Sequence, residues 1–238
     1  MGDADVIRLG TWIVNFYAVA DSGRWTVFDA GAPRYWDQLE RYGIRPDAVE
    51  AVVLTHAHAD HVGIADRLRE HGARVYVHED DEQLATTARP FGKNEKPLLP
   101  YLRHAMAWKL LAHLARNGAA KPQKIGEVTT FRDGEVLDVP GRPRAIHTPG
   151  HTGGHSAFRL EDVDVLIAGD LLCTLNPLTG KRGPQLMPSA FNASTTQMLD
   201  SLTKIESVDA QALYVGHGEP WTNGVRSAVE HARAVGPT

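Results

Sequence analysis

Four potential metal ligands follow a run of apolar residues within one short segment of the chain. Residues Ala51–Thr55 have the composition of a buried strand, and His56, His58, Asp60 and His61 come directly after it. The small alanines between these residues leave room for the loop to curl. Two of the side chains can then reach one ion, while the other two reach a neighbouring ion. Imidazole and carboxylate are ligands that zinc and related divalent metals accept, so the segment predicts a metal site.

Three later candidate ligands also follow predicted strands. His151 lies in a Pro/Gly-rich turn after Arg144–Thr148, Asp170 follows the apolar segment Val163–Ala168, and His217 follows a short apolar run. Side chains at the ends of different strands can meet at one edge of a fold. A shared metal site requires such a meeting, so we expect these residues to complete the site begun at His56.

Short β-rich segments alternate with helical patterns along the chain, as expected for sheets covered by helices. The pattern predicts strands at Thr11–Ala18, Trp25–Asp29, Ala51–Thr55, Ala73–His78, Arg144–Thr148, His155–Leu160 and Val163–Ala168. It predicts helices at Tyr35–Tyr42, Gly63–Glu70, Asp80–Thr87, Thr195–Glu206 and Gly224–Ala234. The fold class is therefore α/β.

The segment Pro90–Pro122 has a different pattern. It opens with a stretch rich in proline, glycine and lysine, and apolar residues then recur at helical spacing from Leu98 to Leu114. We interpret residues 1–238 as a single domain with an amphipathic helical insertion at about 90–122. Packing of the insertion's apolar face on the domain is favoured over a role as a substrate lid or a dimer face.

Composition excludes several classes of protein. Hydrophobic residues make up 42% and charged residues 23% of the 238-residue chain, which is typical of a globular domain. A formal net charge of -4 gives no reason to expect nucleic acid or an anionic membrane as a partner. The single cysteine, Cys173, excludes an internal disulfide framework. With no signal segment or membrane span evident, we expect a cytoplasmic protein with a small-molecule substrate.

Taken together, these motifs resemble those of the metallo-β-lactamase superfamily. That family's pattern is H-x-H-x-D-H, followed by a distant His, an Asp and a final His, and every position has its match here. The resemblance covers most of the chain outside Pro90–Pro122. It implies an αββα sandwich, in which two mixed β-sheets are flanked by helices and the site lies at one edge. It also implies two divalent metal ions, most readily Zn²⁺, with Fe, Mn or Co as alternatives.

The resemblance further implies a role for each matched residue. His56, His58 and His151 would bind the first metal, Asp60, His61 and His217 would bind the second, and Asp170 would bridge the two. Asp29, in a strand-turn segment typical of the family, and His155 are expected to support the ligand loops rather than to bind metal.

This site chemistry predicts hydrolysis of a carbonyl compound. Two ions about 3.5–4 Å apart lower the pKa of a shared water, so that a metal-bridging hydroxide attacks a carbonyl polarised by one of the ions. Asp60 is the candidate catalytic residue, since its carboxylate can also orient this water. The uninterrupted turn around His151 resembles that of glyoxalase II-type thioesterases and lactonases. The leading substrate class is therefore a small lactone, ester or thioester.

Two alternative functions and one partner stay open. The same hydroxide attack opens a strained amide, so a β-lactam is a second candidate substrate. Persulfide dioxygenases share these ligand residues around a single iron, which makes an oxidoreductase the third candidate. An exposed apolar face on Pro97–Asn117 would favour a homodimer.

Overall fold

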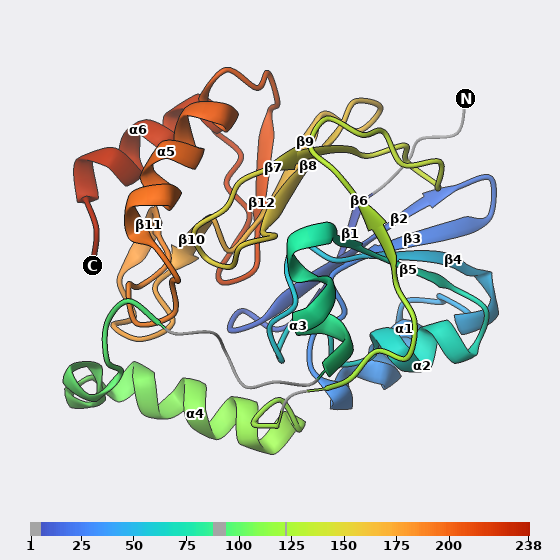
Figure 1. Ribbon diagram of the computed structural model, residues 1–238, viewed down its shortest axis with the longest axis horizontal. Coiled ribbons are helices and arrows are strands. Elements are labelled where there is room, and N and C mark those ends of the chain that lie inside the picture. Colours follow the sequence, from blue (N-terminus) through green and yellow to red (C-terminus); the bar gives the residue numbers. More distant parts are fainter. Residues whose placement is uncertain (1–5, 88–93, 122) are drawn as a thin grey trace.

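Two mixed β-sheets pack face to face, with helices on the outside of each (Figure 1). The computed structural model describes residues 6–87, 94–121 and 123–238. Within them, the larger sheet runs in chain order through β1 (Val6–Gly10), β2 (Asn15–Asp21), β3 (Arg24–Phe28), β4 (Val49–Val53), β5 (Arg74–His78) and β6 (Thr129–Phe131). The smaller sheet has the order β12 (Ala212–Val215), β9 (Val165–Gly169), β8 (Ser156–Leu160) and β7 (Arg144–His147). A hairpin of β10 (Leu172–Leu175) and β11 (Arg182–Leu186) contacts the smaller sheet.

Alternation of apolar side chains along the strands creates the layers. Ala51 and Val53 of β4 lie with Ile167 of β9 in the apolar cluster between the two sheets. Val52 of β4 faces the opposite side of the larger sheet, and Leu166 of β9 faces the opposite side of the smaller one. Because both faces of each sheet are apolar, each sheet needs a second covering layer, which the helices provide.

The helices divide between the two outer faces. Helices α1 (Trp36–Arg41), α2 (Ala65–Glu70) and α3 (Glu82–Thr87) lie on the larger sheet, and α5 (Thr195–Glu206) and α6 (Val225–Val235) lie on the smaller one (Figure 1). Each of these elements lies within a few residues of a predicted helix, and α5 has the predicted bounds. The predicted αββα sandwich is confirmed. Among the described residues, no helix has the length and apolarity needed to span a membrane.

Helix α4 (Ala105–Asn117) lies in the predicted insertion, after the 3₁₀ turn Leu99–Arg103. Residues 90–93 and 122 of that insertion lie outside the described residues. Met106 and Leu110 of α4 are buried in the core that covers the larger sheet, whereas Trp108 is 58% exposed. The apolar face of α4 therefore packs on the domain.

The first predicted strand has the wrong bounds. The structure has the antiparallel pair β1 and β2 in place of one strand at Thr11–Ala18, and residues 11–14 form the connection. The Thr11 hydroxyl accepts hydrogen bonds from the backbone N–H groups of Ile13 and Val14, at 3.2 and 3.3 Å. These local bonds hold a turn and compete with strand pairing. The sequence pattern did not predict strands β1, β6, β10 and β11, which are short or irregular in their alternation of apolar residues.

The loop Leu175–Pro184 is part of the β10–β11 hairpin. Its turn is held from within, because the side-chain oxygen of Asn176 accepts hydrogen bonds from the N–H groups of Leu178 and Thr179. The charged residue Lys181 lines neither of the cavities that contain His58 and His151.

Strand direction brings several chain segments to one edge of the sandwich. Strands β3, β4 and β5 are parallel neighbours, so their carboxyl ends lie at the same edge of the larger sheet. Strands β9 and β12 are parallel, and β7 and β9 run in the same direction because each pairs antiparallel with β8. Loops that follow these strands can therefore meet between the sheets.

Candidate metal centre

The candidate ligands from both sheets meet at this edge in two groups. The first group is His56, His58 and His151, and the second is Asp60, His61 and His217. Within each group the potential ligand atoms all lie within 4.8 Å of one another. The first group joins the loop after β4 to the loop after β7, and the second joins the loop after β4 to the loop after β12. Neither sheet alone could form either group.

The carboxylate of Asp170, directly after β9, lies between the two groups. Its Oδ2 atom is 3.1 Å from Nε2 of His217, 3.4 Å from that of His151, 3.6 Å from that of His61 and 3.9 Å from that of His56. Two ligand atoms on one tetrahedral zinc ion are about 3.4 Å apart, given bonds of about 2.1 Å. The spacing in the structure fits ligands that share metal ions through this carboxylate.

Several atoms that point into the cluster are buried without a hydrogen-bond partner among the described residues. They are Nε2 of His56, His61 and His151, and Oδ1 of Asp170. Buried polar atoms in proteins are nearly always satisfied, and each one left unpaired costs about 1–3 kcal/mol. Coordination to a metal ion would satisfy all four atoms. The arrangement and chemistry of these donors therefore fit a divalent metal site.

The opposite ring nitrogen of each of these histidines is held by the protein. Nδ1 of His61 is 2.9 Å from Oδ2 of Asp29, and Nδ1 of His151 is 3.0 Å from Oδ1 of Asn192. Nδ1 of His56 is 3.0 Å from the hydroxyl of Thr55. An acceptor at Nδ1 fixes the tautomer in which Nε2 carries a lone pair directed at the centre.

His217 is held in the same way by the backbone. Its Nδ1 atom hydrogen bonds to the carbonyl oxygen of Ile13, in the turn that joins β1 to β2. The N-terminal hairpin of the larger sheet thus orients a ring that follows the last strand of the smaller one.

The charge state of the cluster follows from burial and from its own members. Burial, followed by the neighbouring histidines, lowers the pKa values of His56 and His58, so both rings are neutral at neutral pH. Burial also acts against charge on His61 and His217, but the nearby carboxylates, Asp170 foremost, outweigh it and raise both pKa values. In turn, burial raises the pKa of Asp170, but His217 and His61 outweigh it and lower that pKa. Metal binding would displace protons from His61 and His217.

Asp29 and His155 lie behind the cluster, where both hold the ligand loops. Asp29 accepts hydrogen bonds from the backbone N–H and the hydroxyl of Thr55, at 2.8 and 2.9 Å, in addition to its contact with His61. His155 accepts a hydrogen bond from the N–H of Asp170 at Nε2, 3.0 Å away, while its Nδ1 contacts the hydroxyl and carbonyl oxygens of Thr148. Both nitrogens of His155 are therefore in use within the protein.

The backbone passes very close to the cluster at Gly216. A methyl group added there would lie 2.1 Å from Oδ1 of Asp170 and 2.8 Å from Cε1 of His61. Both distances are far shorter than van der Waals contact. Position 216 therefore has to be glycine if the two residues are to keep their places.

The sequence analysis missed two residues that hold the ligand loops. Asn192 belongs to neither a predicted strand nor a predicted helix, and nothing in its neighbourhood distinguishes it from other loop asparagines. Asp81 is part of an acidic run after β5, Glu79-Asp80-Asp81, which we interpreted only as the start of a helix. An aspartate one turn after a parallel strand could have indicated a residue that holds the ligand loops.

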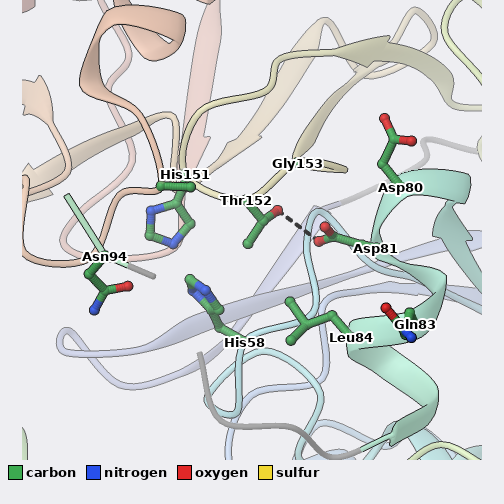
Figure 2. Close-up of a pocket in the computed structure, with 10 residues that line it drawn as sticks. His58, Asp80, Asp81, Gln83, Leu84, Asn94, His151, Thr152 and Gly153 are labelled. Carbon is green, nitrogen blue, oxygen red and sulfur yellow. Dashed lines mark hydrogen bonds between the residues drawn. The ribbon is translucent and has the colours of Figure 1, made fainter. Parts of the chain in front are cut away.

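Two cavities adjoin the cluster. The larger, of about 250 Å³, lies beside His58 and His151, and Figure 2 shows it bordered by Asp80, Gln83 and Thr152 among others. The smaller, of about 30 Å³, lies directly over the cluster, between its polar residues and an apolar wall. That wall consists of Leu110, Leu114, Met187 and Phe191.

A second cluster of histidines lies near the larger cavity. The potential ligand atoms of His78, Asp80 and His147 also lie within 4.8 Å of one another. However, the rings of His78 and His147 are stacked, with centroids 3.9 Å apart and planes inclined by only 10°. Nitrogen lone pairs lie in the ring planes, so those of two stacked rings do not converge on one ion. This cluster is a poorer metal site than the first two groups.

Comparison with known proteins agrees with the geometry. A family model described as "Metallo-beta-lactamase superfamily" matches residues 9–217. A probable metallo-hydrolase from Bacillus subtilis, YflN, is 28% identical over 226 residues, which cover 88% of this chain and 82% of YflN. Another from the same organism, YqjP, is 27% identical over 86% of this chain and 67% of its own length.

Solved structures are similar over nearly the whole chain. The metallo-beta-lactamase family protein TTHA1429 from Thermus thermophilus has a TM-score of 0.67 and 25% identity, covering 98% of this chain and 79% of that one. MEM-A1, a subclass B3 metallo-beta-lactamase from a soil metagenome library, has a TM-score of 0.67 over 97% of this chain and 90% of its own. Its 17% identity shows a shared fold alone. On the family match, the fold and the arrangement of the cluster, this chain belongs to the metallo-β-lactamase superfamily.

Proposed function

We propose that this protein is a hydrolase with two divalent metal ions, which acts on a small lactone, ester or thioester. The position of Asp170 carries the proposal. One carboxylate oxygen within 3.1–3.9 Å of four imidazole nitrogens from two ligand groups fits a bridge between two ions. His56, His58 and His151 would bind the first ion, and Asp60, His61 and His217 the second. Zn²⁺ suits this mixed nitrogen and oxygen set best, although Fe, Mn or Co would also fit.

Asp60 is the candidate catalytic residue. Bound in these positions, two ions would supply a nucleophile from water near neutral pH and would polarise a carbonyl group. The side chain of Asp60 is 14% exposed, whereas that of Asp170 is only 3% exposed. Asp60 therefore borders the space that substrate and water enter, and its carboxylate can orient an attacking water by accepting a hydrogen bond from it.

The walls of the site favour a substrate with an apolar part. Leu110 and Leu114 of α4 and Phe191 face the polar cluster across the smaller cavity. An apolar acyl group could pack on this wall while its carbonyl lies at the cluster. The neighbouring 250 Å³ cavity could accept the leaving group, since Asp80, Gln83 and Asn94 supply polar contacts there.

Metal analysis combined with a substrate panel tests the proposal. Purified protein would be assayed for metal content, and then with lactones, thioesters, aryl esters and β-lactams on one preparation. Two ions per chain and turnover of a lactone, ester or thioester are the expected results. Preferred turnover of β-lactams would show that the substrate is a β-lactam and not a lactone, ester or thioester. A single bound iron with consumption of oxygen would show that the protein is an oxidoreductase and not a hydrolase.

The homodimer and the cytoplasmic location stay predictions. Trp108 in α4 is 58% exposed, and Leu99 in the 3₁₀ turn before it is 75% exposed. Both support a homodimer formed through this segment. Sedimentation equilibrium with the parent and with Trp108→Glu would test it. A parent that is monomeric at micromolar concentration would exclude the dimer.

A further inference from the structure

Asp81 is a buried acid that the proposed chemistry does not use. It ends the 3₁₀ turn Glu79–Asp81, directly after the carboxyl end of β5 and before α3. Only 2% of the residue is exposed, whereas aspartate is seldom fully buried without partners that offset the cost of removing it from water. The partners of Asp81 are therefore informative.

These partners belong to two separate ligand loops. Oδ2 of Asp81 accepts hydrogen bonds from the N–H of Ala57, at 3.1 Å, and from the hydroxyl of Thr152, at 2.7 Å. Oδ1 accepts a hydrogen bond from the N–H of Gly154, at 2.8 Å. Ala57 lies between His56 and His58, and Thr152 directly follows His151. One carboxylate thus joins the loop after β4, from the larger sheet, to the loop after β7, from the smaller sheet.

The fit between Asp81 and the second loop is close. A methyl group added at Gly154 would lie 2.7 Å from both Cβ and the backbone nitrogen of Asp81. Figure 2 shows Asp81 hydrogen bonded to Thr152 beside His58 and His151, which come from opposite sides of the cavity. The glycine allows the loop to lie against the turn, and the carboxylate then fixes it there.

The hydrogen bonds require a carboxylate rather than a neutral amide. All three partners donate, and they approach both oxygen atoms of Asp81. An asparagine offers one oxygen and one NH₂ group, so one of its ends would face an N–H or O–H donor with a donor of its own. Asp81→Asn keeps the size of the side chain but loses the bond to Gly154 or the bond to Ala57, according to which end carries the NH₂ group.

We propose that Asp81 is a positioning residue that sets the separation of the two loops, so that His56, His58 and His151 converge on one metal ion. This inference rests on the proposed metal-dependent function. Asp81 touches none of the ligand rings through the bonds described above, and it acts through the backbone on either side of them. Hydrogen bonds beyond the ligands commonly change metal affinity by about 10–100-fold.

Metal titration of the purified full chain tests the inference. Protein freed of metal by a chelator would be titrated with Zn²⁺ against a competing chelator, and with Co²⁺ followed by visible absorption. For Asp81→Asn we expect affinity at the His56, His58 and His151 position to fall by about 10–100-fold, while the other position keeps its affinity. The Co²⁺ spectrum should change at the weakened position only.

Two further variants make the result specific. Glu82→Gln alters the next residue, which is exposed at the start of α3, and should bind both ions as the parent does. Thr152→Val removes one donor at nearly constant volume and should weaken the same position by a smaller factor. Because Thr152 and Asp81 share this bond, the double variant should lose less affinity than the sum of the two single changes.

The outcomes separate this inference from the proposed function. If the parent binds no metal tightly, both fail. If the parent binds two ions and Asp81→Asn binds them with the same affinities, the inference is overturned and the proposed function stands. A variant that is less stable to urea but has unchanged metal affinities shows a merely structural role for Asp81, and this also overturns the inference.

Discussion

Replacing Asp29 by asparagine tests how far the site depends on residues behind the ligands. Asp29 accepts bonds from the N–H and the hydroxyl of Thr55, and its Oδ2 lies 2.9 Å from Nδ1 of His61. Its backbone is left-handed, with φ of 59°, a conformation that asparagine tolerates well. The substitution therefore changes the hydrogen bonding and leaves the backbone unstrained.

The magnitude follows from the tautomer of His61. With its oxygen kept on Thr55, an asparagine at position 29 directs NH₂ at Nδ1, so the ring proton moves to Nε2. Nε2 then loses the lone pair that faces Asp170. We expect affinity for the ion held by Asp60, His61 and His217 to fall about 10–100-fold, or about 1.4–2.7 kcal/mol.

Chelator competition with Zn²⁺, measured for each binding step, is the assay. Asp21→Asn is the matched control, because Asp21 is exposed at the end of β2 and should leave both steps unchanged. Urea unfolding checks that Asp29→Asn is folded before metal is added. Equal affinities in Asp29→Asn and the parent would refute the role assigned to the His61 tautomer.

Four further predictions concern activity and stability. His58→Ala or Asp170→Ala should abolish turnover of the identified substrate while circular dichroism shows a retained fold, and wild-type activity in either would contradict the ligand assignment. Gly216→Ala should cost about 1–3 kcal/mol in urea unfolding through overpacking, and should weaken Zn²⁺ binding as Asp170 is displaced. Burial, and then neighbouring His151, lowers the pKa of His155 to about 3. The free energy of unfolding that the neutral ring contributes is therefore fully present above pH 6.5, and it is lost by about 1.4 kcal/mol per pH unit as the pH falls towards 3. His155→Gln should show a shallower dependence of its unfolding free energy between pH 6.5 and 4.5, and an equal slope would contradict this. Leu114→Ala should raise KM more for long-chain than for short-chain acyl substrates; an equal change for both would exclude the apolar wall as an acyl site.

Much of the fold follows from local pattern in the sequence. Apolar alternation in β4 and β9, and helical spacing in α5, each fix one element by its own residues. The family resemblance then predicts that these elements form two sheets. The site follows where the chemistry of the ligand is itself the signal, as with His56 and His58, because clustered histidines after a strand have few other roles.

The rest depends on contacts between distant segments, which local pattern does not encode. Asp81 and Asn192 resemble ordinary surface residues in the sequence, and their bonds to the loop around His151 form only when distant segments meet. Likewise, the turn after β1 is determined by the Thr11 hydroxyl, which competes with the strand propensity of its neighbours. A carbonyl oxygen such as that of Ile13 carries no residue-type signal at all.

The reach of the cluster along the chain has a consequence for its assembly during synthesis. The loop that begins at His56 leaves the ribosome early, but its partner His217 follows β12 and emerges near the end of translation. About two hundred residues have to be synthesised between Ile13 and His217 before the carbonyl of Ile13 can bond to that ring. A nascent chain can therefore present histidines before the proposed metal site is complete, and selective metal binding there would follow translation of nearly the whole protein.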